Sequence, residues 1–313
     1  MKKFLRILAI LCMSLFITSS ASATIILNNW TLDVGGIDGL IDSDGYLYTD
    51  VDQIGFTGAA HSVTNFGTGA GFTEGIIYAT DMIGASNPTD GLGQTQFVYG
   101  GNILDGFEMT FEFKVESQVT AATADFFSWT HTGVGDVAGS ATDNSGNIRD
   151  LASLNIYIDN LNDGSGLQSD RDTGLGFDDG ALIATFQVLP GDGGIYNNAT
   201  SDGSDDATFE LLWAETGVFS YLGQDLSEWT SGGSPVTLAI TDSNFDGDDN
   251  DNGVLDSTYG NNYWTVPANQ TPFNYVASED GSASVGYVPE PTTLLLFGFG
   301  LLGMASVSRR KIF

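Results

Sequence analysis

The stretch Phe107-Glu108-Met109-Thr110-Phe111-Glu112-Phe113-Lys114-Val115-Glu116 decides the fold class of this 313-residue chain. Apolar residues alternate along it with polar, mostly charged ones. Because successive side chains of a β-strand point to opposite faces, this order produces one apolar row and one charged row. The segment is therefore predicted to be a strand with one buried face.

The same alternation recurs in four later segments, which are Leu154–Ile158, Leu182–Val188, Phe209–Trp213 and Val236–Ile240. Clusters rich in Gly, Asp and Asn separate these segments and supply turns and positive-φ positions. No amphipathic helix of about 12 or more residues can be drawn outside the termini. We therefore predict an all-β body, an antiparallel β-sandwich with a jelly-roll-like arrangement.

Composition excludes several classes of protein. Hydrophobic residues make up 42% of the chain and charged residues only 16%, which is too apolar for intrinsic disorder and too poor in charged helix formers for a coiled coil. Acids outnumber Lys and Arg by 40 to nine. Since contacts to phosphates need a basic face, nucleic acid is excluded as a partner.

The charge is distributed unevenly along the chain. Three of the bases lie in the first six residues and three lie at 309–311, so that residues 24–288 hold three bases and 39 acids, a formal charge of −36. The two ends are therefore physically distinct from the acidic body between them.

The N-terminal end has the pattern of a secretory signal peptide. A basic start leads into the apolar run Ile7–Ile17, and small residues follow up to Ala21-Ser22-Ala23. We predict a signal peptide over residues 1–23, cut by signal peptidase after Ala23, with Ala21 and Ala23 as the cleavage residues. The single cysteine, Cys12, would leave with it, so the mature chain would have no disulfide or redox cysteine.

The C-terminal end has three parts in order. Pro289-Glu290-Pro291 precedes an uncharged run of 17 residues over 292–308, the short limit for a transmembrane helix. Arg309, Arg310 and Lys311 follow and are predicted to stop the helix on the cytoplasmic side of the inner membrane. The prolines prevent backward extension of the helix and leave an extended peptide that a protease can grip.

This order resembles the PEP-CTERM sorting tail, over the last 26 residues of the chain. The resemblance implies that Pro289, Glu290 and Pro291 are recognised by a membrane-embedded exosortase. It also implies an exported protein that passes through an inner-membrane-anchored intermediate and then reaches the cell surface or extracellular matrix. The alternative is a plain C-terminal membrane anchor.

The body itself resembles the flocculation-associated group of PEP-CTERM proteins. The short motifs that carry this resemblance are Asn28-Asn29-Trp30, Asn155–Asp159, Gly176–Thr185, Phe209–Leu212 and Asp225–Ser227. It implies a role in cell aggregation within an exopolysaccharide matrix and brings no catalytic residues with it.

The predicted organisation is a signal peptide at 1–23, a β-sandwich body at 24–280, a spacer at 281–288 and the sorting and anchor segment at 289–313. The stretch 278–288 fits either a last strand or the spacer to the membrane. One domain is preferred because about 265 residues lie within the range of large all-β domains.

The acidic stretch that starts at Asp242 begins like a calcium-binding loop. Oxygen-bearing residues alternate up to Asp246, and Gly247 then permits a tight turn around one Ca²⁺. Gly253 stands where an EF-hand has its bidentate acid, so a different loop geometry is expected. The candidate ligands are Asp242, Asn244, Asp246, Asp248 and Asp256. The alternative is a solvated acidic hairpin tip.

Two tryptophans are candidates for binding sugar rings by stacking. Trp129 and Trp264 lie in polar surroundings and are expected to be more exposed than Trp213, which belongs to an alternating strand. Packing in the core or in a turn is the alternative for each.

The residues offer little support for an enzyme. With two histidines and no mature cysteine, zinc sites of three His or of Cys and His cannot be built. There is no G-x-S-x-G elbow, and carboxylate pairs carry no information in so acidic a chain. We expect a non-catalytic surface or matrix protein that acts in flocculation or biofilm formation, with exosortase, signal peptidase and exopolysaccharide as partners. A calcium-assisted carbohydrate-binding module and a secreted glycan hydrolase are the alternatives.

Overall fold

The fold is known from a computed structural model that describes residues 25–40, 46–85, 95–96, 107–123, 126–161, 176–197, 200, 202–231, 236–246 and 274–287. The predicted signal peptide and the segment 289–313 lie outside these ranges, as do Asp248, Asp256 and Trp264. Within them, no helix has the length and apolar character needed to cross a membrane.

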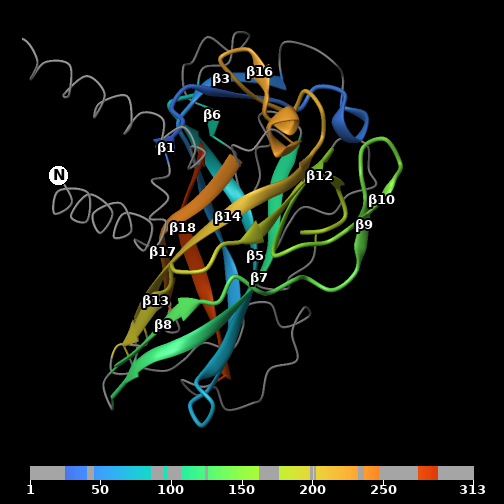
Figure 1. The fold of residues 1–313 in the computed structure, drawn as a ribbon. Coiled ribbons are helices and arrows are strands. Elements are labelled where there is room, and N and C mark those ends of the chain that lie inside the picture. Colours follow the sequence, from blue (N-terminus) through green and yellow to red (C-terminus); the bar gives the residue numbers. More distant parts are fainter. Residues whose placement is uncertain are drawn as a thin grey trace, which may run out of the picture.

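Six long strands run along the length of the body (Figure 1). They are β4 (Gln53–Asn65), β5 (Ala70–Ile83), β7 (Glu108–Ala122), β14 (Asp202–Ala214), β17 (Val236–Asp246) and β18 (Asn274–Tyr287). Their order in the sheet is β14-β17-β18-β4, and β5 and β7 follow. Each neighbouring pair is antiparallel.

Shorter strands close the sheet on itself between β7 and β14. Near one end, β11 (Leu154–Asp159) pairs with β7 and β12 (Ala181–Val188) pairs with β14, and the two pair with each other. Near the other end, β8 (Phe126–His131) pairs with β7 and β13 (Gly194–Asn197) pairs with β14, and β8 and β13 pair with each other. Closure leaves the long strands paired on both sides, which removes the exposed edges that favour aggregation.

The two walls of the closed sheet enclose a core, which confirms the predicted antiparallel β-sandwich. Among the long strands of this circuit, however, those that follow one another in the chain are neighbours in the sheet, apart from β7 and β14, which the shorter strands connect. This meander differs from the Greek-key crossovers of the jelly roll that we expected. The reason is that alternation sets which face of a strand is buried but carries no information on which strand lies beside it.

The burial pattern of β7 confirms the prediction that this alternating stretch is a strand with one buried face. Phe107 and the odd-numbered residues from Met109 to Val115 are at most 5% exposed and belong to the main core. The opposite face is less wet than expected, because Thr110 donates a hydrogen bond to the carbonyl of Phe177 and Glu112 accepts one from Tyr157. The segment around Phe177 and the neighbouring strand β11 therefore cover part of the charged row.

A second, four-stranded sheet covers one end of the sandwich, at the top of Figure 1, and we call this the capped end. Its strands are β2 (Trp30–Asp33), β3 (Leu47–Val51), β15 (Phe219–Tyr221) and β16 (Gln224–Asp225). Trp30, Leu32 and Tyr48 have no exposed surface and join the main core. The cap therefore shares one hydrophobic core with the long strands.

Smaller elements complete the described part of the chain. They are β1 (Ile25–Ile26), β6 (Thr95–Gln96), the hairpin of β9 (Ser140–Thr142) with β10 (Ile148–Asp150), and the 3₁₀ helices η1 (Ile37–Gly39) and η3 (Leu226–Ser231). Strand β6 pairs with β5, and η3 packs near β14 and β15.

The expected spacer over 281–288 is wrong for residues 281–287, which belong to β18. Ala283 and Val285 are 1% and 5% exposed and sit in the main core. The small and polar residues of this stretch suggested a linker, but they tolerate the interior of a sheet because both neighbouring strands satisfy the backbone. The folded body therefore extends to Tyr287.

Candidate functional site: the junction between body and tail

The tail leaves the body from a strand that is hydrogen-bonded on both sides. Tyr287, the last residue of β18, pairs with Val236 of β17 and with Ile25 of β1. Because neighbours hold it on either side, β18 has little freedom to fray at this end. The first tail residue, Val288, follows directly.

The start of the body lies beside its end. Ile25 pairs with Tyr287 and Ile26 with Gly286, and the amide of Leu27 donates a 2.8 Å hydrogen bond to the carbonyl of Val285. The predicted signal cleavage after Ala23 falls two residues before Ile25. The two predicted processing sites, 23 and 289–291, thus flank one short antiparallel pair of strands.

The surface around this junction is apolar. Ile25 and Ile26 are 43% and 56% exposed. The rings of Trp229, on η3, and Tyr287 meet edge to face with their centroids 6.0 Å apart, and both are partly buried against the core. We call Ile25, Ile26, Trp229 and Tyr287 the junction patch.

The PEP-CTERM protein-sorting motif matches residues 288–311 of this chain. The match begins at the residue after β18 and includes Pro289, Glu290 and Pro291 as well as Arg309, Arg310 and Lys311. The predicted resemblance of the tail is confirmed.

The fold and the tail together define an all-β exported protein. It carries a PEP-CTERM sorting motif, passes through a membrane-anchored intermediate and is processed by an exosortase. No curated protein and no solved structure matches the chain. The resemblance of the body to the flocculation-associated group stays a prediction.

The candidate calcium ligands begin inside a strand. Asp242, Asn244 and Asp246 belong to β17, where Asp246 is the direct cross-strand partner of Asp202, and Asn244 is that of Asp280. In the part of the chain that the structure describes, no group of three or more His, Cys, Asp or Glu residues is placed to hold a metal. With Asp248 and Asp256 outside that part, the calcium site stays a prediction.

The expected exposure of Trp129 is wrong. The side chain is 7% exposed and packs against Phe127, at 5.4 Å between ring centroids, in a small cluster that includes Tyr196. Alternation along β8 explains the burial, because Phe127, Trp129 and His131 all point into the space between the walls. Trp213, which was expected in the core, is only half-buried and lies under the guanidinium of Arg149 at 4.3 Å.

A buried chain of polar side chains lies beside Trp129. Oγ of Ser117 is 3.2 Å from Nδ1 of His131, and Nε2 of His131 is 3.0 Å from Oδ1 of Asp205. The side chain of His131 has no exposed surface. The residues come from β7, β8 and β14. Residue types alone did not identify this set, although Ser117 and His131 fall on the inward positions of their strands.

The environment shifts the pKa values of this pair. Burial raises the pKa of Asp205 above its usual 3.8, and the hydrogen bond and charge of His131 oppose that shift. For His131, burial lowers the pKa, but the carboxylate of Asp205, the charge of Asp192 and a backbone hydrogen bond at Asp206 together outweigh burial, so the pKa lies above its usual 6.5. Each group therefore depends on the other to carry its charge inside the protein.

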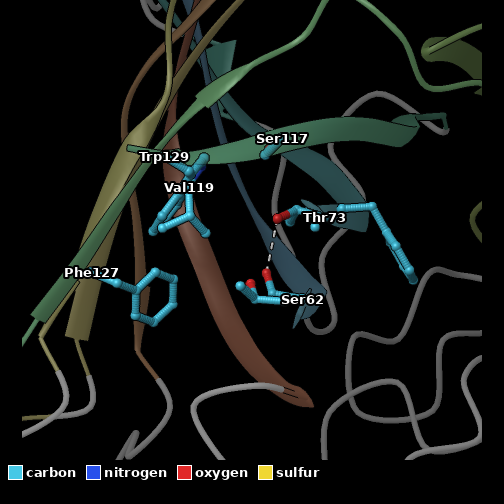
Figure 2. Close-up of a pocket in the computed structure, with 9 residues that line it drawn as sticks. Ser62, Thr73, Ser117, Val119, Phe127 and Trp129 are labelled. Atoms are coloured by element: carbon cyan, nitrogen blue, oxygen red, sulfur yellow. Dashed lines mark hydrogen bonds between the residues drawn. The ribbon is translucent and has the colours of Figure 1, made fainter. Parts of the chain in front are cut away.

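The space around these residues is too small for a substrate. Ser117 and Trp129 line a cavity with Ser62 and Thr73, whose hydroxyl oxygens are 2.9 Å apart (Figure 2). Its volume of about 10 Å³ corresponds to one water molecule. Ser117, His131 and Asp205 thus have the residue types of a hydrolase triad. Their position beside a cavity too small for a substrate favours a structural role.

Proposed function

We propose that this chain is a non-catalytic surface or matrix protein that acts in exopolysaccharide-associated aggregation, as in flocculation or biofilm formation. The observation that carries the proposal is an acidic body, formally −36 over residues 24–288, joined directly to a sorting motif. The final location in this proposal is the cell surface or the extracellular matrix.

The excess of carboxylates is not neutralised within the protein. The described residues contain two bases, and each is already engaged: Lys114 pairs with Glu74 at 3.1 Å, and Arg149 with Asp143 at 2.8 Å. Such a surface repels its own copies at low salt and is suited to bridging by divalent cations.

In this mechanism Ca²⁺ links carboxylates of neighbouring proteins or joins them to acidic sugars. Hard divalent cations prefer oxygen ligands, and several carboxylates from different chains can complete one coordination shell. The calcium-loop candidates at 242–256 are the first place to look for such contacts. The same cation can also stabilise the body itself by reducing repulsion.

The test is sedimentation of cells that display the protein, compared with cells that lack it. We expect clumping in Ca²⁺ and its loss on addition of a chelator. A matched control replaces Ca²⁺ by NaCl at equal ionic strength, which screens charge but cannot bridge. Clumping in NaCl or in chelator as strong as in Ca²⁺ would count against the bridging mechanism. Equal clumping of cells that lack the protein would remove the role altogether.

The single-water cavity supports the non-catalytic proposal for the Ser117–His131–Asp205 set alone, since a separate cleft of about 300 Å³ is lined by Glu74 and Glu112. A glycan hydrolase would need an open cleft in which two carboxylates flank a sugar ring. Incubation of the purified chain with a panel of polysaccharides is expected to release no reducing ends. Release that is abolished by His131→Gln or by Glu112→Gln would overturn it.

A further inference from the structure

We infer that the capped end of the body rests on the lipid surface while the chain is held by its tail, with the junction patch and Leu222 in the headgroup region. The inference deepens the sorting role and rests on the membrane-anchored intermediate that the motif implies. The partner of this surface is thus the same bilayer that anchors the uncharged run 292–308.

The length of the connection limits how far the body can stand from the membrane. Four residues, 288–291, separate the end of β18 from the uncharged run that starts at Thr292. Even fully extended, the chain from Tyr287 to Thr292 spans at most about 18 Å. The headgroup region on one side of a bilayer is roughly 5–8 Å deep. The junction patch is therefore kept within a short distance of lipid by covalent geometry alone.

The side chains at this place suit an interface between lipid and water. Ile25 and Ile26 are neighbours in a strand, so they point to opposite faces, and yet both are exposed. The Trp229–Tyr287 pair adds two aromatic rings with polar tips, the residue types that gather at membrane surfaces. Burial of these groups in the headgroup region would remove apolar surface from water.

A second apolar group lies at the same end. Leu222 is 83% exposed, the most exposed of the large apolar residues that the structure describes. It lies in the two-residue loop between β15 and β16, at the capped end (Figure 1). Its backbone has a φ of 51°, a conformation that Leu rarely adopts and that Asn or Gly occupies more easily. An exposed Leu in this loop therefore has no explanation in the stability of the body.

Charge indicates that the contact is apolar rather than electrostatic. No Lys or Arg accompanies the patch on β1, β15, β16 or η3, and Glu228 and Asp225 lie nearby on the chain. A surface of this kind gains nothing from anionic lipids, which attract basic segments. We therefore expect contact with zwitterionic bilayers and weaker contact when anionic lipid is added.

The test uses the full chain, reconstituted in phosphatidylcholine vesicles, with Cys12→Ser as background. Single cysteines at Ile26→Cys and Leu222→Cys carry an environment-sensitive fluorophore, and Ile195→Cys is the matched control. Ile195 is 47% exposed on β13, toward the end opposite to the cap. We expect a blue shift and about threefold less quenching by aqueous iodide at the first two positions, but no change at Ile195.

The outcomes separate this inference from the sorting role. If the chain fails to float with the vesicles, the membrane-anchored intermediate fails, and the inference falls with it. If the chain floats but iodide quenches positions 26 and 222 as strongly as 195, the inference is wrong while the sorting role stands. Protection at 195 equal to that at 26 and 222 would also overturn it. Far-UV spectra and thermal melts of each variant show that the body is folded.

Discussion

Leu222 and Gly223 form the loop between β15 and β16, and their φ values are 51° and 76°. Two positive φ angles in a two-residue loop are the signature of a type I′ turn, which favours Asn-Gly. A Leu in the left-handed region costs roughly 1–2 kcal/mol. Leu222 therefore lowers the stability of the loop while it exposes an apolar side chain.

The variant Leu222→Asn is expected to raise the free energy of unfolding by about 1 kcal/mol, because Asn adopts positive φ at lower cost. Urea unfolding at constant pH measures the change. Gly223→Ala is the matched control and should lower the free energy of unfolding, since it introduces a side chain at a φ of 76°. A Leu222→Asn variant less stable than the parent would show that the leucine packs rather than protrudes.

The contribution of His131 to stability depends on pH, and the direction of its pKa shift sets that dependence. The pKa of His131 is raised above 6.5 in the folded state, so its contribution to stability is present below pH 6.5. That contribution is lost as the pH rises through the folded-state pKa. In His131→Gln the amide can still donate to Asp205 but cannot carry a proton.

We therefore expect the difference in unfolding free energy between parent and His131→Gln to shrink as the pH rises above 6.5. Below that pH, loss of the buried partner of Asp205 should cost about 3–5 kcal/mol. Denaturant titrations across the pH range test this. A constant difference at all pH values would mean that folding leaves the pKa of His131 unshifted.

At the scale of single elements, the β9–β10 hairpin is organised by one carboxylate. Asp143 accepts hydrogen bonds from the backbone amides of Ser145 and Asn147, at 3.0 and 2.8 Å, and from Nε of Arg149 at 2.8 Å. Burial raises the pKa of Asp143, but the bonds from Asn147 and Arg149 outweigh burial and hold it below its usual 3.8. The ionised side chain thus fixes the turn and the outgoing strand together.

Asp143→Asn is expected to destabilise the protein by about 2–3 kcal/mol, because an amide replaces an ionised acceptor facing a guanidinium. Hydrogen exchange over residues 140–150 should accelerate first. Asp150→Asn removes the same charge from an exposed position and should have little effect. Similar destabilisation by both variants would indicate a general charge effect instead of this turn.

Strand β18 connects the fold to processing. Val285 is 5% exposed, and its backbone neighbours pair with both β17 and β1. Val285→Ala should cost roughly 1–2 kcal/mol through the lost methyl groups and the cavity left behind. Amide exchange at 281–287 should match that of β17 in the parent chain, whereas fast exchange there would restore the spacer that the sequence suggested.

At the scale of the whole molecule, the charge of −36 on residues 24–288 opposes compaction. Raising NaCl from about 10 mM to about 0.5 M shortens the screening length from roughly 30 Å to under 5 Å. We expect the melting temperature to rise by about 5 °C over this range. Sucrose at equal osmolality is the control, and a melting temperature independent of salt would show that the acids are too far apart to interact.

Much of the architecture was predictable from the sequence because the patterns that encode it are local. The alternation at 107–116 specifies a strand and its buried face, and the order of Pro289–Pro291, an apolar run and three bases specifies the tail. Trp129 and the stretch 281–287 were misjudged for the same reason. Their polar neighbours are a local property, but their burial depends on which strands lie beside them.

By itself, the sequence determined an exported, acidic, all-β chain with a sorting tail. Hydropathy, the periodicity of apolar residues and charge can all be read from residues that follow one another in the chain. Only the tertiary structure decided that Ile25 pairs with Tyr287 and that His131 lies between Ser117 and Asp205. These contacts join residues far apart in the chain. The packing of the whole sheet sets the strand register that brings them together. The meeting of the two ends at one place is thus a property of the closed fold.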